Sequence, residues 1–115
     1  MEAMSNVWER SDRALCTHPG WATLQGWGHV AASFFALFQN RDAIQFILTN
    51  EKVAVEGDVG WVSLDENILG EQVGSMVAAL NVFAKAPTTD ARTDGNPWRM
   101  VCHHGSVVIP TPAGP

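Results

Sequence analysis

The chain has 115 residues, and seven lysines and arginines stand against twelve aspartates and glutamates, which gives a formal net charge of −5. Apolar residues make up 46% and charged residues 17%, a composition too apolar and too weakly charged for a disordered chain. We therefore expect one globular domain. The acidic balance argues against nucleic acid or an anionic membrane as a partner, because such binding needs clustered Lys and Arg.

The cysteines and the apolar segments point to a soluble cytoplasmic protein. Cys16 and Cys102 are too few for a disulfide scaffold, and no signal peptide is recognisable. Residues 14–40 contain no Asp, Glu, Lys or Arg, but Pro19 and several glycines interrupt them. The continuously near-apolar part, residues 30–38, is far shorter than the roughly 20 residues that a membrane span needs.

The first part of the chain predicts two helices around a short strand and a turn. Apolar residues at i, i+3 and i+4 predict a short amphipathic helix over residues 3–10. Residues 14–17 suggest a brief strand, and His18-Pro19-Gly20-Trp21 forms a turn. Residues 26–40 form the clearest helix, with an apolar stripe of Trp27, Val30, Ala31, Phe34 and Phe38.

The remainder predicts four long antiparallel strands in a meander. A strand that begins at Ile44 and continues through Val55 is followed by a Gly57-Asp58 hairpin loop and a strand over residues 59–69. Residues 70–74 read as a loop, 74–86 as a strand and 87–97 as a turn. The last strand spans residues 98–109, and 110–115 form a frayed tail.

These elements predict an α+β fold in which a curved antiparallel sheet forms a half-open cone around a helix. Strands of about ten residues or more must twist and curl. One helix covers the inner face of such a sheet. A second copy of the chain is the simplest cover for the outer face, so we expect a homodimer or a higher homo-oligomer.

Several segments stand in a characteristic order along the chain: His18-Pro19-Gly20-Trp21, Val30 and Phe34, Ile44-Gln45-Phe46, Val59-Gly60-Trp61-Val62 with Glu66-Asn67, Asn81-Val82-Phe83, and Trp98-Arg99-Met100-Val101 before His103-His104-Gly105-Ser106. In this order they resemble the SnoaL-like branch of the nuclear transport factor 2-like superfamily, which includes ketosteroid isomerases. The resemblance covers roughly residues 3–109.

The resemblance implies a single SnoaL-like domain over residues 1–115, with a disordered or extended tail at 110–115. It implies a cystatin-like α+β roll, usually dimeric, with a pocket inside the cone. Members include polyketide cyclases, isomerases, dehydratases, epoxide hydrolases and non-enzymatic binding or assembly domains. Members usually begin with a longer helix that closes one pocket wall, whereas this sequence starts near the second helix. A partner subunit is expected to fill that gap.

The candidate acid–base residues each have a structural alternative. His18 is either a pocket-mouth acid or base or a turn histidine bonded to backbone. His103 and His104 are adjacent on a strand and point to opposite faces. We predict that Trp98, His104 and Ser106 face the cone, because that face carries the apolar bulk. The alternative is a core histidine bonded to a neighbouring strand.

Two further polar residues share apolar strand faces. Glu66 shares one face with Val62, Leu64 and Ile68, where desolvation would raise its pKa as a general acid or base requires. It could instead be a structural partner of a histidine or arginine, and Asp65 takes its place if the parity differs by one residue. Asn81 would bind a ligand carbonyl or serve as a structural hydrogen-bonding group.

The aromatic and cysteine patterns give the remaining candidates. The predicted ligand-binding residues are Trp21, Trp27, Phe34, Trp61, Trp98 and His103, although such aromatics are often simply core. Cys16-x-His18 and Cys102-x-His104 could meet as a Cys₂His₂ metal site if their strands were neighbours, but structural zinc sites usually use C-x₂₋₄-C pairs. We therefore predict no metal. No P-loop, G-x-G-x-x-G or G-x-S-x-G motif is present, and no cofactor is expected.

Three functions remain open. The first is binding of a small, mostly apolar molecule in the cone. The second is a cofactor-independent isomerase, cyclase or hydrolase, with Glu66 or His104 as base and Asn81 or His18 stabilising developing negative charge. The absence of Tyr argues against a ketosteroid-isomerase mechanism, whose oxyanion donor is usually Tyr. The third is an oligomerisation or interaction domain that works through the outer sheet face.

Overall fold

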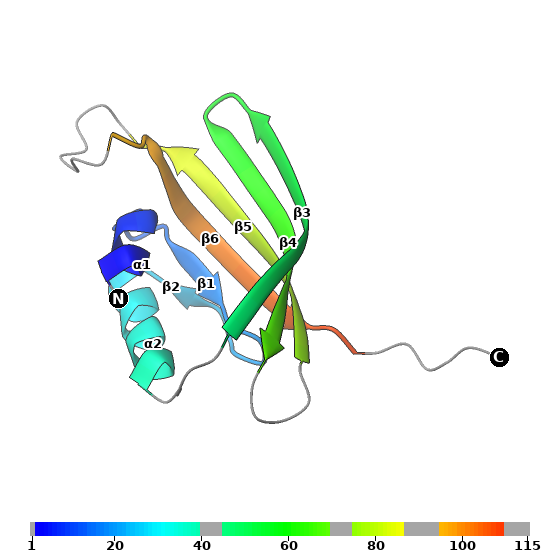
Figure 1. The fold of residues 1–115 in the computed structure, drawn as a ribbon. Helices are drawn as coiled ribbons and strands as arrows, with labels where there is room; N and C mark the ends of the chain where they lie inside the picture. Colours follow the sequence, from blue (N-terminus) through cyan, green and yellow to red (C-terminus); the bar gives the residue numbers. More distant parts are fainter. Residues whose placement is uncertain (1, 40–44, 70–74, 87–94, 110–115) are drawn as a thin grey trace.

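The computed structural model describes residues 2–39, 45–69, 75–86 and 95–109, and it has two helices on one side of a six-stranded sheet (Figure 1). In chain order the elements are α1 (Glu2–Val7), β1 (Leu15–Thr17), β2 (Leu24–Gln25), α2 (Trp27–Gln39), β3 (Gln45–Glu56), β4 (Val59–Leu69), β5 (Ser75–Lys85) and β6 (Trp98–Val107).

The strand order is β2-β1-β6-β5-β4-β3, which confirms the predicted antiparallel meander of four long strands. Gly57 has a positive φ of 60° in the turn between β3 and β4, a conformation that glycine adopts without steric cost. The sequence did not predict β2 or the parallel pairing of β1 with β6. Strands of two or three residues are too short to show a periodicity.

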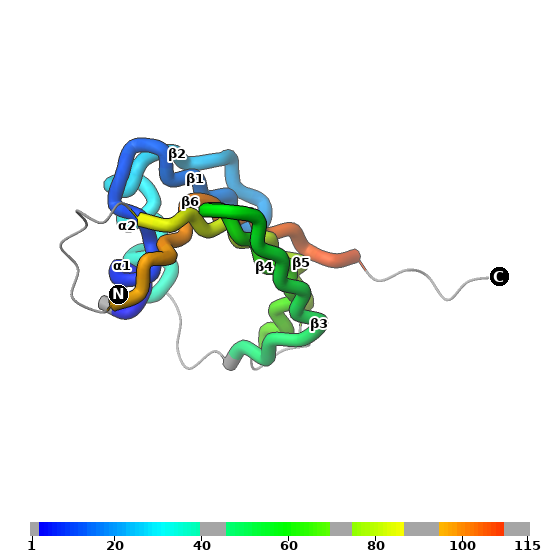
Figure 2. Tube along the Cα trace, turned by 90° about the horizontal axis from the view of Figure 1, so that it is seen from above, coloured from blue at the N-terminus to red at the C-terminus, as the bar shows by residue number. Residues whose placement is uncertain are grey.

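The sheet is strongly curved. Seen from above, the strands follow an arc from β1 and β2 round to β3, and both helices lie at its open side (Figure 2). Register shifts interrupt two long strands, between Thr49 and Lys52 in β3 and opposite Val82 and Phe83 in β6. Each shift places an extra residue in one strand, which bends the strand and increases its twist. This curvature confirms the predicted cone.

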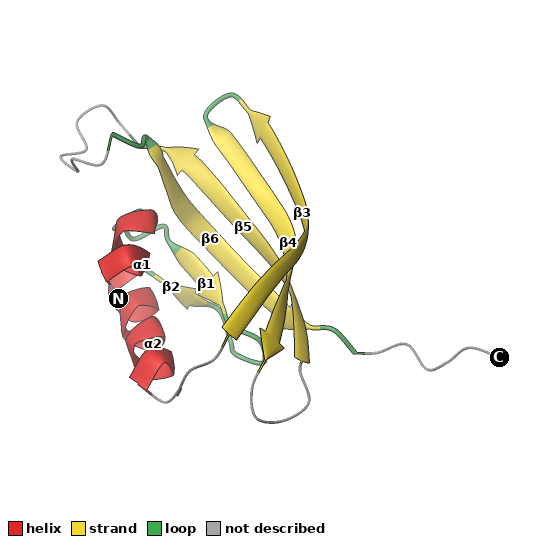
Figure 3. Cartoon of the chain, viewed as in Figure 1, coloured by secondary structure: helices red, strands yellow, loops and turns green. Residues whose placement is uncertain are grey.

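The hydrophobic core lies between the helices and the β1–β6 side of the sheet (Figure 3). Trp8, which follows α1, is fully buried and packs against Phe34 of α2, with 6.1 Å between the ring centroids. Val30 and Phe34 come from the predicted stripe of α2, and Ala14 and Cys16 supply the opposite wall. Burying a side chain of the size of Val30 or Phe34 contributes about 1.5–3 kcal/mol.

Phe35 and Phe38 of α2 remain 53% and 47% exposed, so the apolar surface of this helix is wider than the part that packs into the core. The predicted loop at 70–74, most of the predicted turn at 87–97 and the predicted tail at 110–115 lie outside the described residues. Neither helix in the described part of the chain is long and apolar enough to cross a membrane.

Candidate functional site

A cavity of about 580 Å³ opens between α2, the His18–Trp21 turn and the concave face of the sheet. Most of its lining side chains are apolar, and Glu66 and the histidines are its titratable groups. The lining residues are His18, Pro19, Trp21, Phe34, Leu37, Phe38, Phe46, Glu66, Ile68, Ser75, Val77, His103 and Val107.

Strand pairing explains why the sheet residues of the cavity share one face. Glu66 of β4 pairs with Val77 of β5, and Val77 pairs with Val107 of β6. Residues directly opposite each other on neighbouring strands project to the same side. The predicted apolar row around Glu66 is therefore part of the cavity wall.

His103 is the polar group at the β6 side of the cavity. Its Nδ1 lies 2.5 Å from Oδ1 of Asn81, its pairing partner on β5. Burial, with smaller effects from nearby His18 and His104, lowers the pKa of His103 to about 4. The imidazole is therefore uncharged at neutral pH. Asn81 contacts His103 and is not itself among the residues that line the cavity.

Glu66 is the acidic group of the cavity. Its side chain is half-buried, and desolvation raises the pKa of its carboxyl group, because an ionised carboxylate loses water on burial. This is the shift expected from the sequence. A carboxyl group of this kind can hold or release a proton closer to neutral pH than an exposed glutamate.

His18 links the turn to α2. Its side chain is buried, and its Nε2 lies 2.9 Å from Oγ of Ser33. The Ser33 hydroxyl donates to the backbone oxygen of Val30 at 2.7 Å, so it accepts the proton on Nε2. The rings of Trp21 and Phe34 pack edge-on against His18 at 4.9 and 4.8 Å. His18 thus lines the cavity and also holds its wall in place.

The predicted orientation of the last strand is wrong beyond Met100. Val82 pairs with Cys102 and Phe83 pairs with Met100, so Val101 is an extra residue in β6. This irregularity reverses the alternation expected from Trp98. His103 therefore lines the cavity, whereas His104 is exposed and, like Ser106, is outside the lining set.

The predicted aromatic residues separate into different environments. Trp21 and Phe34 line the cavity. Trp27 packs in the core, 6.3 Å from Trp8 between ring centroids. Trp98 belongs to a second, smaller hollow of about 240 Å³.

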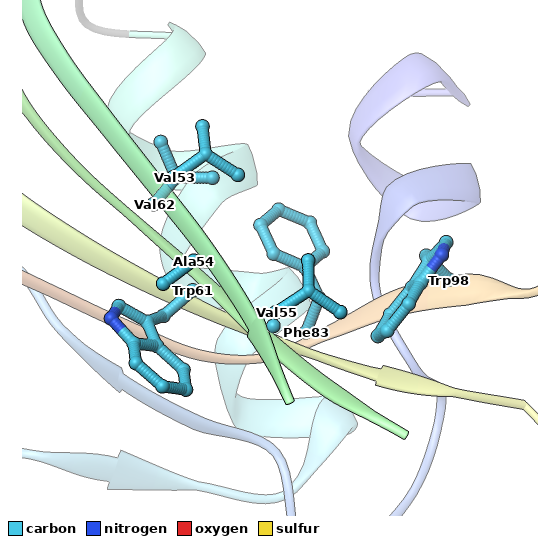
Figure 4. A pocket seen from close by; sticks show the side chains of 8 residues that line it. Val53, Ala54, Val55, Trp61, Val62, Phe83 and Trp98 are labelled. Carbon is cyan, nitrogen blue, oxygen red and sulfur yellow. The ribbon is translucent and has the colours of Figure 1, made fainter. Parts of the chain in front are cut away.

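The second hollow lies at the β3–β4 hairpin end of the concave face (Figure 4). Val53, Val55, Val62, Phe83 and Trp98 are its apolar side chains. Trp61 is also among its lining residues, and its indole lies on the opposite side of β4 from Val62 (Figure 4). The hollow contains no ionisable side chain among its lining residues.

The two Cys-x-His steps do not combine in the predicted geometry, although their strands are neighbours. Cys16 pairs with His103, and Cys102 pairs with Leu15, so the two cysteines lie on opposite faces. Burial, with a smaller effect from Cys102, raises the pKa of Cys16 to about 12, which keeps this thiol protonated. Across the described residues, no cluster of three or more His, Cys, Asp or Glu side chains is arranged to hold a metal ion.

Sequence reasoning placed Ile68 on the face of Glu66 but missed much of the remaining apolar lining, including Phe46, Val77 and Val107. These residues required knowledge of how β3, β5 and β6 align with β4. Leu37 and Phe38 required the helix orientation, because α2 presents apolar residues on more than one side.

Comparison with known proteins is decisive for the family. The model of the SnoaL-like domain matches residues 1–110. The chain belongs to the SnoaL-like domain family. This match and the curved six-stranded sheet confirm the family resemblance and the α+β fold.

Solved structures of similar proteins agree with this assignment. A proposed dehydratase of the NTF2-like family from Streptomyces avermitilis is 36% identical, with a TM-score of 0.79, over 95% of this chain and 82% of that chain. A proposed calcium/calmodulin-dependent protein kinase type II association domain from Thiobacillus denitrificans is 26% identical, with a TM-score of 0.78, over 94% of this chain and 82% of that chain.

A curated relative is longer. F-box protein SKIP8 of Arabidopsis thaliana is 24% identical over 109 residues, which is 95% of this chain and 43% of that protein. The SnoaL-like chain thus spans less than half the length of this relative.

Proposed function

We propose that this SnoaL-like protein binds a small, mostly apolar molecule in the cavity between α2 and the concave sheet face. The cavity itself carries this proposal. Its volume of about 580 Å³ lies within the range of roughly 300–1,000 Å³ typical of ligand pockets. Trp21 and Phe34 supply aromatic surface, and Glu66 and His103 supply a few polar contacts. This combination suits a ligand with an apolar body and one or two polar groups.

A fragment screen by protein-observed NMR tests the proposal, with two matched serine variants. Ser75→Trp places an indole at the cavity wall, whereas Ser63→Trp places one on the exposed opposite face of the sheet. We expect hits to be lost with Ser75→Trp and kept with Ser63→Trp. A screen without hits, or hits that survive Ser75→Trp, would contradict binding in this cavity.

A second candidate function is proton-transfer catalysis in the same cavity. Two observations favour it: the raised pKa of Glu66 and the uncharged imidazole of His103, both at the cavity wall. The structure at 36% identity is a proposed dehydratase. A ligand that is turned over by the parent protein, and bound but not turned over by Glu66→Gln, would support catalysis. Equal turnover by the two proteins would exclude Glu66 as the acid or base.

We also propose that the protein forms a homodimer through the convex face of the sheet. Trp61 and Leu80 lie on this face and are 38% and 43% exposed. Apart from Val82, their neighbours on β4, β5 and β6 are small or polar. The charged side chains of this face include Asp65 and Lys52 of β3, which pairs with Ser63. The pairing rows across β4, β5 and β6 are Trp61–Val82–Cys102, Ser63–Leu80–His104 and Asp65–Ala78–Ser106. A sheet face that exposes large apolar residues among a few charged ones is typical of a protein interface.

A further inference from the structure

We infer that the cavity selects ligands that carry a hydroxyl or N–H group, which donates a hydrogen bond to Nε2 of His103. In this arrangement Asn81 is a positioning residue, because its side-chain oxygen determines which imidazole nitrogen carries the proton. The inference rests on the proposed binding function and adds the chemical class of the ligand.

The first step is the contact between His103 and Asn81. Nδ1 of His103 faces Oδ1 of Asn81 at 2.5 Å. A carboxamide oxygen can only accept a hydrogen bond, so Nδ1 must carry the proton. A neutral imidazole has a single N–H group. Nε2 therefore keeps its lone pair and acts as an acceptor.

The second step is the direction of that lone pair. Nδ1 faces Asn81 on β5, and the lone pair of Nε2, the ring nitrogen on the far side of Cε1, points away from Asn81. His103 lines the cavity, and among the described residues its hydrogen bond is made through Nδ1. The Nε2 acceptor is thus available to a molecule in the cavity.

The third step is that the imidazole stays neutral. His103 is largely buried and lies 6.2 Å from the ring of His18. Both effects disfavour a positive charge and lower its pKa to about 4. The acceptor on Nε2 is therefore present throughout the physiological pH range rather than being lost by protonation.

The charged and titratable groups of the cavity disfavour anionic ligands. The described lining residues include no Lys or Arg, so nothing there neutralises a bound carboxylate or phosphate. Ionised Glu66 accepts hydrogen bonds and repels anions. His18 directs its Nε2 proton to Ser33. An uncharged aromatic alcohol between Trp21 and Phe34 satisfies the site better than a carboxylic acid of the same size.

The tautomer is tested by long-range ¹H–¹⁵N correlation of the histidine rings at pH 7. We expect the His103 signals of a ring protonated at Nδ1. Asn81→Asp keeps an acceptor of the same shape and adds a negative charge that favours a protonated ring, so Nδ1 should stay protonated, whereas Asn81→Leu should populate the form protonated at Nε2. A parent protein protonated at Nε2 would overturn the inference. The parent and the isosteric Asp variant decide the question even if Asn81→Leu does not fold.

Ligand selection is tested with 2-naphthol and 2-methylnaphthalene, which have the same ring system but carry a hydroxyl and a methyl group, respectively. We expect 2-naphthol to bind roughly 3- to 10-fold more tightly to the parent protein, the effect of one net hydrogen bond. His103→Phe should abolish the difference, and His29→Phe, at an exposed position of α2 outside the cavity lining, should keep it. If both probes bind equally to the parent, the selection is wrong and the proposed binding function stands. If neither probe binds and the fragment screen has no hits, both fail.

Discussion

At the scale of single residues, burial acts in opposite directions on His103 and Glu66. Loss of water lowers the pKa of the imidazole and raises the pKa of the carboxyl group, because in each case the uncharged form is favoured. Both groups line the same cavity. Desolvation therefore reduces the charge of the cavity interior, and a bound apolar molecule would increase this effect by displacing further water.

The raised pKa of Glu66 makes stability dependent on pH. The folded protein holds this proton more tightly than the unfolded chain, whose glutamate pKa is near 4.5. The contribution of Glu66 to stability is therefore complete below about pH 4.5 and is lost as the pH rises through the folded pKa. We expect Glu66→Gln to be more stable than the parent at pH 7, by less than about 1 kcal/mol because water screens a half-buried carboxylate.

Urea unfolding at several pH values between 4 and 7 checks this expectation. The difference between Glu66→Gln and the parent should shrink toward zero at the acidic end. Asp65→Asn, one residue away on the opposite sheet face, is the matched control and should not reproduce this profile. If Glu66→Gln were less stable than the parent at pH 7, the assignment of Glu66 to a desolvating environment would be contradicted.

At the scale of elements, β6 shows how far the sequence is informative. Its extent was predicted almost to the residue, because strand periodicity and the flanking turn residues are local signals. The irregularity at Val101 has no such signal, and it decides whether His103 or His104 enters the cavity. Similarly, Glu66 was placed correctly because β4 is regular on its cavity side. In the regular strand, the sequence thus predicted which side chains share the cavity face, and in the interrupted strand it did not.

Close packing at Gly105 is a second property of β6. A Cβ atom at this buried position would lie 3.2 Å from Val77 and 3.3 Å from Pro19. We expect Gly105→Ala to destabilise the fold by about 1–3 kcal/mol, as overpacking does. The control is Gly28→Ala in α2, where a Cβ atom would meet nothing within 4 Å. It should be neutral or stabilising by up to about 1 kcal/mol. Thermal unfolding measures the stability of both variants. If Gly105→Ala were as stable as Gly28→Ala, the close packing at Gly105 would be contradicted.

At the scale of the whole molecule, the two sheet faces differ in what covers them. The concave face carries both helices, the core and the cavity (Figure 1). The convex face exposes Trp61 and Leu80. Covering the convex face by a second copy would bury this apolar surface, which is the physical basis of the proposed dimer.

Leu80→Lys tests this interface. We expect the charge to weaken the dimer by about 2 kcal/mol or more, the cost typical of a central interface residue. Val53→Lys is the matched control, because Val53 is 67% exposed on the concave side and should leave the dimer intact. Light scattering over a dilution series gives the mass of each variant. A parent protein that is monomeric at micromolar concentration would contradict the proposed dimer.

The parallel pairing of β1 with β6 has a consequence for how the protein is made. Leu15–Thr17 joins the long strands through residues 102–104, close to the other end of the chain. During synthesis on the ribosome, the N-terminal segment and α2 emerge first and must wait for their neighbour strand. Contacts so distant in sequence form slowly because a long loop has to close. The cavity, which needs both His18 and His103, can therefore assemble only after β6 has been translated.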